Sequence, residues 1–336
     1  PCLPTIYRDK NLTKIDIFIN RMRIVEFELL LKSHTFVKDW FEPGNLYVDY
    51  EGVAQHYGLN TEVLDFTSDI DIALFFAICP YDRATDSYRL PDKDASHTGI
   101  IYVINPMFYN PRNFGSNEVC IFEDDLKPIG LQPFERPAVQ RGYGVRLPDG
   151  KALDRVRKYE FEYTPQEALD LYERFCKLSQ LWVKDELIEP TKRISSKNIF
   201  AFKEFSLAWQ RYPIEGLTRN RCAKLLRKKG IRLHSDAPIE RFTDKDIRRL
   251  YPQLKERYEE YSSRMGSRKI ISLTDDPEDP TNPSLRKIKD ESPYMDTKLI
   301  AESLLLRIIQ TGRTASSLTK PCQMSEGIDI STLPLA

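Results

Sequence analysis

The chain opens with a helical pattern of apolar residues. Five of them recur at three- and four-residue spacing over residues 13–32, which would place them on one face of a helix. They are Ile15, Phe18, Met22, Val25 and Leu29. Thr13 or Asn11 is placed to cap the first turn. Residues 48–57 predict a second helix that ends at Gly58, because glycine adopts the left-handed conformation without steric cost.

Shorter segments rich in apolar and β-branched residues predict strands. These predicted strands cover residues 62–67, 99–106, 138–148 and 159–164. The second is apolar throughout, so we expect it to be buried. After the first strand, Ser68 and Asp71 fit a capping box in front of the apolar run 72–78, which predicts a buried helix.

The second half of the chain is predicted to be mainly helical. Thr164 and Glu167 form a second capping pattern, and the helical pattern then continues to about residue 270, with stops expected at four prolines. They are Pro190, Pro213, Pro238 and Pro252. Prolines and acids predict a linker over 271–296, and residues 297–336 predict a final helix and tail. The predicted class is α+β: a small mixed or antiparallel sheet with packed helices over residues 1–163, then a helical region over 164–270.

The amino-acid composition limits the classes of protein to which this chain can belong. The 336 residues carry no net charge, and no apolar run is long enough for a membrane-spanning helix, so we expect no membrane association. The charge is nevertheless unevenly distributed along the chain. Residues 1–150 hold 15 basic and 22 acidic side chains, whereas residues 151–336 hold 35 basic and 28 acidic side chains. The six cysteines are scattered without metal-binding spacing, which fits a cytoplasmic protein and predicts no metal.

Polar residues gather between the second predicted helix and the helix over 72–78. His56 ends a helix, Thr61 and Asp65 flank a turn into a strand, and Thr67 and Ser68 stand where that strand gives way to a helix. Free amides at a helix start favour anions, so the cluster is a candidate pocket for a phosphate-bearing ligand. A structural role is the alternative: a capped helix, a core histidine and an Asp that braces the turn.

The same segment resembles the FRG domain family. The resemblance rests on Gln55-His-Tyr-Gly58, Thr61, Leu64-Asp-Phe-Thr67 and Ala73-Leu-Phe-Phe-Ala77, with Pro4 and Arg8 before them and Arg136, Gln140 and Gly142 after them. The family commonly has Trp where this chain has Phe66. The aromatic-Arg-Gly element that names the family is expected upstream of Pro1. Residues 1–163 are therefore expected to form an FRG domain.

The family layout is similar to that of the ADP-ribosyltransferase superfamily, which uses NAD. The resemblance implies catalytic roles for Gln140, His56 and Asp65. It implies cofactor-binding roles for Thr61, Thr67, Ser68 and Tyr57. A toxin or anti-phage effector would use such an activity. Gln140 departs from the late carboxylate of that superfamily, because an amide cannot stabilise an oxocarbenium-like charge as a carboxylate does.

The alternative is a non-catalytic binding module that contacts a partner protein or nucleic acid through its basic half. Residues 217–234 hold the densest group of basic side chains. The candidates are Arg219, Arg221, Lys224, Arg227, Lys228 and Lys229. Clustered Lys and Arg release counterions from a phosphate backbone, although a solvated helix face is the common explanation for such a cluster.

Overall fold

The computed structural model describes residues 2–9, 11–41, 48–82, 87–92, 94, 97–103, 126–129, 134–147, 150, 157–177 and 181–266. The predicted linker over 271–296 and the predicted helix and tail over 297–336 lie outside these residues. The described residues fall into two compact units, and the division lies between Tyr251 and Pro252. The fold and the sites below belong to the first unit.

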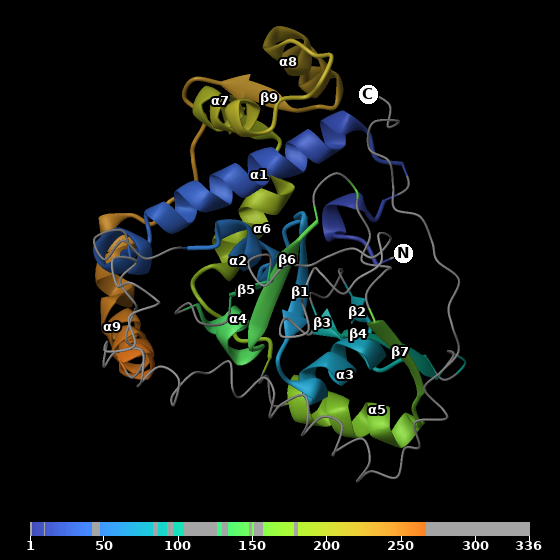
Figure 1. The fold of residues 1–336 in the computed structure, drawn as a ribbon. Coiled ribbons are helices and arrows are strands. Elements are labelled where there is room, and N and C mark those ends of the chain that lie inside the picture. Colours follow the sequence, from blue (N-terminus) through green and yellow to red (C-terminus); the bar gives the residue numbers. More distant parts are fainter. Residues whose placement is uncertain are drawn as a thin grey trace, which may run out of the picture. The chain divides into compact units, whose positions relative to one another are not determined.

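Helices alternate with short strands throughout the described residues (Figure 1). The helical elements are η1 (Thr5–Tyr7), α1 (Lys14–Lys32), η2 (Phe36–Phe41), α2 (Tyr50–His56), α3 (Ile70–Ile78), α4 (Glu135–Val139), α5 (Pro165–Tyr172), η6 (Glu173–Lys177), α6 (Ile188–Ser196), α7 (Phe202–Arg211), α8 (Arg219–Lys228) and α9 (Asp244–Gly266). The strands are β1 (Val63–Thr67), β2 (Tyr81–Asp82), β3 (Ser87–Tyr88), β4 (Thr98–Val103), β5 (Leu126–Pro128), β6 (Gly142–Arg146), β7 (Arg157–Glu162), β8 (Ile199–Ala201) and β9 (Arg232–His234). The predicted α+β class is confirmed.

The largest sheet of the described residues has the order β1-β6-β5 and is antiparallel. Strand β1 lies beside β6 although the two are far apart in the sequence (Figure 1). The pairs β2-β3 and β4-β7 are antiparallel as well, whereas β8 and β9 are parallel and are connected through α7 and α8. The sheet therefore joins the first predicted strand to a strand that follows α4.

Helix α1 forms the centre of this unit. It begins with a capping box between Thr13 and Asp16, so the predicted cap at Thr13 is confirmed. Helix α2 packs on one side of α1 and α7 on another, and Figure 1 shows α1 running between these two groups of elements. The apolar core against α7 and α8 includes Phe18, Met22 and Phe205, whose side chains are almost fully buried.

Several local expectations need correction. Residues 138–148 are not one strand, because α4 continues through Val139 and β6 begins only at Gly142. Strand β4 is half-exposed rather than buried, with Ile100 and Val103 open to solvent. Helix α9 passes through Pro252, which removes one backbone hydrogen bond without ending the helix.

Candidate functional site

The β1-β6 ladder places Asp65 and Thr67 on one face of the sheet. Asp65 pairs with Gly144 and Thr67 pairs with Gly142, so each of these side chains faces a glycine across the ladder. His56, at the end of α2, fills the space that Gly142 leaves open. A Cβ atom at position 142 would lie 2.7 Å from the His56 ring. The glycine is therefore needed because the imidazole approaches the backbone of β6 closely.

Gln140, His56 and Asp65 lie in a row across this face, and a hydrogen bond joins the first two. The side-chain amide of Gln140 donates to the carbonyl of Leu181 at 3.1 Å, which turns its oxygen Oε1 towards Nδ1 of His56 at 2.7 Å. Nδ1 therefore carries the proton that this oxygen accepts. The other ring nitrogen, Nε2, is buried without a hydrogen bond and lies 3.7 Å from a carboxyl oxygen of Asp65.

Asp65 is the accessible end of the series. His56 and Gln140 are 5% exposed, whereas the Asp65 side chain is 36% exposed. Burial by the surrounding chain nevertheless raises the pKa of Asp65, and the charges of His56 and Arg8 and a hydrogen bond from Gln55 oppose that increase. An accessible carboxyl of raised pKa beside an imidazole is suited to proton transfer.

Two threonines orient the amide of Gln55. The hydroxyl groups of Thr5 and Thr61 donate to its oxygen at 3.0 and 2.6 Å. The amide nitrogen of Gln55 is then left for Asp65. Thr61 thus acts on Asp65 through Gln55, and the sequence analysis did not include Gln55 among the site residues.

Thr67 is fixed at the junction of β1 and α3. Its hydroxyl donates to the backbone oxygen of Gln140 at 2.8 Å and accepts from the backbone N–H of Asp69 at 3.1 Å. The predicted capping residue, Ser68, is one position too early: the carboxyl of Asp69 accepts from the first N–H groups of α3. Ser68 is instead bonded through its backbone N–H to the oxygen of Arg141 at 3.4 Å.

The segment Leu181–Leu187 lies against the same motif residues. Besides the bond from Gln140 to Leu181, the guanidinium of Arg136 donates to the carbonyl of Val183 at 3.1 Å and lies 4.2 Å from the centre of the Trp182 ring. The hydroxyl of Tyr57 donates to Asp185. Tyr57 therefore faces this segment rather than Asp65.

Burial and the charge of Asp185 raise the pKa of Tyr57, and burial with the nearby Glu186 raises the pKa of Asp185 to about 7. Glu186 in turn accepts from Nε2 of His34 at 3.0 Å, while Nδ1 of His34 accepts from a backbone N–H. His34 is thus neutral with its proton on Nε2. Residues 181–187 are thus held by four side chains, His34, Tyr57, Arg136 and Gln140, which come from three separate parts of the chain.

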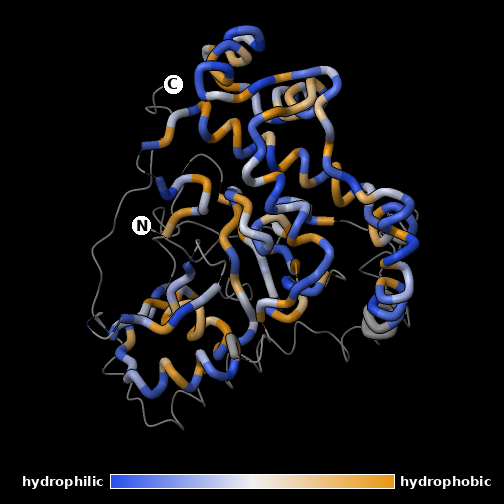
Figure 2. Tube along the Cα trace, turned by 180° about the vertical axis from the view of Figure 1, so that it is seen from behind, coloured by the Kyte–Doolittle hydropathy of each residue, from blue (hydrophilic) through white to orange (hydrophobic). Residues whose placement is uncertain are grey.

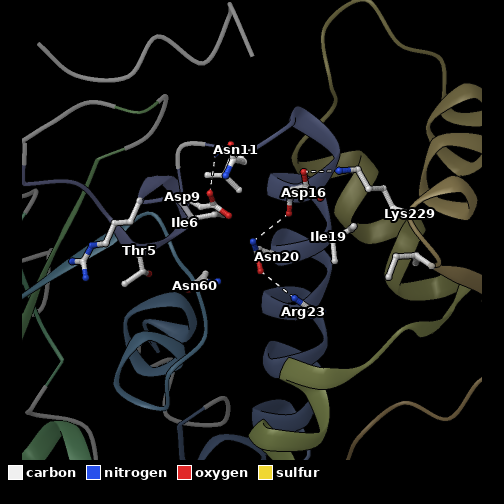
Figure 3. A pocket seen from close by; sticks show the side chains of 13 residues that line it. Thr5, Ile6, Asp9, Asn11, Asp16, Ile19, Asn20, Arg23, Asn60 and Lys229 are labelled. Atoms are coloured by element: carbon white, nitrogen blue, oxygen red, sulfur yellow. Dashed lines mark hydrogen bonds and ion pairs between the residues drawn. The ribbon is translucent and has the colours of Figure 1, made fainter. Parts of the chain in front are cut away.

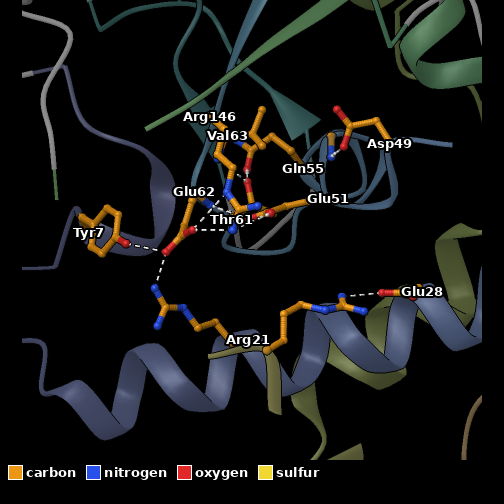
Figure 4. Close-up of polar contacts among 12 residues, drawn as sticks. Tyr7, Arg21, Glu28, Asp49, Glu51, Gln55, Thr61, Glu62, Val63 and Arg146 are labelled. Atoms are coloured by element: carbon orange, nitrogen blue, oxygen red, sulfur yellow. Dashed lines mark hydrogen bonds and ion pairs between the residues drawn. The ribbon is translucent and has the colours of Figure 1, made fainter. Parts of the chain in front are cut away.

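A second buried polar cluster centres on Glu62 (Figure 4). Its carboxylate accepts from Tyr7 at 2.6 Å, from Arg146 at 2.8 Å and from Arg21. Burial alone would raise the pKa of Glu62, but these donors outweigh that effect and lower it. The sequence analysis missed Glu62, although an acid next to a buried strand is a signal for an ion pair. The cluster joins η1, α1 and β6 to the residue that precedes β1.

Helix α8 presents its basic side chains to solvent. Cys222 and Leu226 are buried on its inner face, whereas all six candidate basic residues are exposed. Figure 2 shows α8, at the top, largely in the colour of hydrophilic residues. Lys229 forms an ion pair with Asp16 at 2.9 Å and Arg219 bonds to the hydroxyl of Ser206. This basic face belongs to a part of the fold other than the Asp65 site.

The structure thus brings four of the predicted site residues into direct contact, and these are His56, Asp65, Thr67 and Gln140. The residues of three sequence motifs meet here: Arg8 before α1, the segment 55–67, and Arg136 with Gln140 and Gly142.

Comparison with protein families identifies the part of the chain that contains the first two of these motifs. Residues 2–86 match the family model of the FRG domain. This chain carries an FRG domain. No curated protein and no solved structure matches the chain significantly.

The described residues include neither a metal-binding cluster nor a membrane-spanning helix. Within the described ranges, no group of three or more His, Cys, Asp or Glu side chains is placed to hold a metal ion. Among the helices that the structure describes, none has both the length and the apolar character needed to cross a bilayer.

Proposed function

We propose that the FRG domain is a catalytic module in which Asp65 acts as the general base. The observation that carries the proposal is the series Gln140–His56–Asp65, which ends at an accessible carboxyl. Gln140 fixes the tautomer of His56, and the other ring nitrogen of His56 lies 3.7 Å from Asp65. The arrangement is similar to catalytic triads in one respect, because a third group, here Gln140, orients the histidine beside the reacting side chain.

The reaction that we propose is transfer of ADP-ribose from NAD to a macromolecule. The nucleophile of the acceptor would form a bond to the ribose carbon, nicotinamide would leave with the electron pair of its glycosidic bond, and Asp65 would take the proton lost by the acceptor. The family resemblance supports the choice of NAD. In this scheme Gln140 and His56 act by positioning Asp65, because both side chains are buried.

The test is the thermal midpoint of the full chain with and without millimolar NAD⁺. A ligand at 100 times its dissociation constant adds about 2.7 kcal/mol to the free energy of unfolding, which gives a clear shift. We expect Asp65→Asn to retain the fold, because the exposed carboxyl is replaced by an amide of the same shape. We also expect it to abolish ADP-ribosylation of a lysate acceptor by labelled NAD⁺.

The matched control is Asp92→Asn, which changes a side chain that is 74% exposed and outside the site. Gln140→Ala is a poorer test, because it also removes the bond to Leu181. No NAD⁺ shift in the wild-type chain, or equal activity in Asp65→Asn and Asp92→Asn, would contradict the proposal.

The second candidate function is nucleic-acid binding through α8. The observation that favours it is the exposure of the basic face while its apolar residues are buried. Substituting Gln for Arg221, Lys224 and Lys228, which lie on one face of α8, should abolish binding to random-sequence DNA at low salt. The wild-type affinity should fall steeply as salt rises. Binding that is absent at low salt, or insensitive to salt, would contradict this function.

A further inference from the structure

A separate cavity of about 820 Å³ lies along the N-terminal half of α1. Its wall comes from η1 and the turn after it, from the loop that precedes β1, and from the residues that follow α8. Figure 3 shows Asp16, Asn20 and Arg23 in a row along α1, with Lys229 bonded to the first of them. A volume of this size is within the range of small-molecule sites.

Arg23 is the side chain that gives the cavity its chemistry. Its guanidinium makes two long hydrogen bonds to neutral oxygens, Oδ1 of Asn20 at 3.3 Å and the backbone oxygen of Lys197 at 3.4 Å. Its Nε atom is buried without any partner. Burial lowers the pKa of Arg23, whereas Arg21, two positions earlier, pairs with Glu62 and has a raised pKa.

No carboxylate within the described residues pairs with Arg23. A partly buried cation without a counterion is unfavourable, because water is removed from the charge and no opposite charge replaces it. Planar guanidinium groups bind carboxylate and phosphate oxygens through two parallel hydrogen bonds. The missing partner of Arg23 is therefore an anion.

The other charges on the wall leave it positive. Lys229 and Asp16 neutralise each other, since their ion pair is 2.9 Å long. Arg8 and Arg23 then stand against the single carboxylate of Asp9 among the lining residues. The amide of Asn60 also lines the cavity and makes no hydrogen bond within the part of the chain that the structure describes. An anion with several oxygen acceptors would use these donors together.

We propose that this cavity binds a small phosphorylated molecule, with its phosphate oxygens bonded to the guanidinium of Arg23 and the amide of Asn60. A phosphate supplies more acceptor oxygens and more negative charge than a carboxylate, and so it can bond to the guanidinium of Arg23 and to a second donor together. This site is independent of the proton-transfer role of Asp65.

The test is a titration of the full chain with inorganic phosphate at constant ionic strength, read as the thermal midpoint and by calorimetry. Phosphate should raise the midpoint of the wild-type chain and bind with measurable heat. Arg23→Met should weaken phosphate binding about tenfold or more, because a charge-assisted hydrogen bond is lost. Without phosphate its midpoint should equal or exceed that of the wild type, since the unpaired charge is gone.

The matched control is Arg89→Met, which removes an exposed arginine that pairs with Asp92 outside the cavity and should leave phosphate binding unchanged. A second variant, Asn60→Asp, adds a carboxylate to the wall and should weaken phosphate binding to a similar extent even if Arg23→Met fails to fold. No response to phosphate in the wild-type chain, or equal responses in Asn60→Asp and the wild type, would overturn the proposal.

Discussion

The imidazole of His56 lies against the backbone of Gly142, where a Cβ atom would be only 2.7 Å from two ring atoms. The two residues are 86 positions apart in the sequence. The contact explains why a histidine at the end of α2 and a glycine at the start of β6 occur together. A substitution at either position should therefore alter the packing of the other residue.

Gly142→Ala should therefore displace His56 from Gln140. The added methyl group cannot be accommodated without moving the buried ring, so we expect a loss of about 1–3 kcal/mol in the free energy of unfolding. Denaturant unfolding gives the energy, and imidazole NMR resonances report the displacement of the ring. Gly58→Ala is the control, because Gly58 has a φ of 84° but no atom lies near its Cβ position. Backbone strain should cost this variant about 1–2 kcal/mol in the free energy of unfolding. Its His56 resonances should nevertheless stay unchanged. Unshifted resonances in Gly142→Ala would show that the contact does not fix the ring.

Glu62→Gln should be strongly destabilising. The substitution leaves Arg21 partly buried without its carboxylate and weakens the bonds to Tyr7 and Arg146. Breaking such a pair costs about 3–5 kcal/mol, measured by denaturant unfolding. Asp92→Asn breaks the exposed pair with Arg89 and should cost less than about 1 kcal/mol. Comparable losses in the two variants would contradict the central role of Glu62.

Glu26 should make the protein less stable as pH rises. Glu26 and Glu204 are both fully buried around Lys197, and burial, with Glu204 nearby, raises the pKa of Glu26 to about 8. Between its unfolded value of 4.5 and about 8, the folded chain binds a proton that the unfolded chain does not. The free energy of unfolding therefore falls as pH rises through this window.

The isosteric variant Glu26→Gln removes that proton exchange. Its denaturant midpoint should fall less between pH 5 and pH 8 than that of the wild type, and the variant should be the more stable protein at pH 8. Asp185, whose pKa is also raised, contributes to both proteins alike and cancels in the comparison. Parallel pH profiles for the two proteins would mean that Glu26 is ionised in the folded state.

Arg136→Lys should loosen the segment 181–187. Lysine keeps the positive charge, but it cannot stack on Trp182 and donate to Val183 at once, as Arg136 does. We expect a loss of roughly 1–2 kcal/mol and faster amide hydrogen exchange in residues 181–187. Arg193→Lys, which alters an exposed pair with Glu240, should leave this exchange unchanged. Slow exchange in Arg136→Lys would show that charge alone holds the segment.

The sequence predicted those parts of the fold that depend on neighbouring residues, such as apolar periodicity, helix caps and glycine turns. Helix α1 has a strong apolar periodicity and a capping box at Thr13, and it forms as predicted. Gly58 ends α2 with positive φ, also as predicted. The expected strand over 138–148 fails because Glu135–Val139 forms a helix and Arg141 then takes a positive φ of 48° before β6 begins. Alternation of side chains alone does not reveal that break.

Several members of the candidate site were predictable from the sequence, but Gln55 and the hydrogen bonds between the members were not. Motif residues identified His56, Asp65 and Gln140, yet no spacing rule indicates that Gln140 reaches Leu181 or that Tyr57 turns to Asp185. These bonds join residues that are 41 and 128 positions apart, so only the folded chain reveals them. The three-residue strands β8 and β9 were missed because such short segments have no measurable period.

The contacts of residues 181–187 have a consequence for synthesis of the chain on the ribosome. Tyr57 is synthesised 128 residues before its acceptor, Asp185, so its hydroxyl can form this hydrogen bond only after Asp185 has left the ribosome. A nascent chain that pauses before residue 181 would expose the apolar and polar surfaces that this segment later covers, and such surfaces recruit chaperones or aggregate. The N-terminal motifs thus complete their contacts with residues 181–187 only after that later segment has been synthesised.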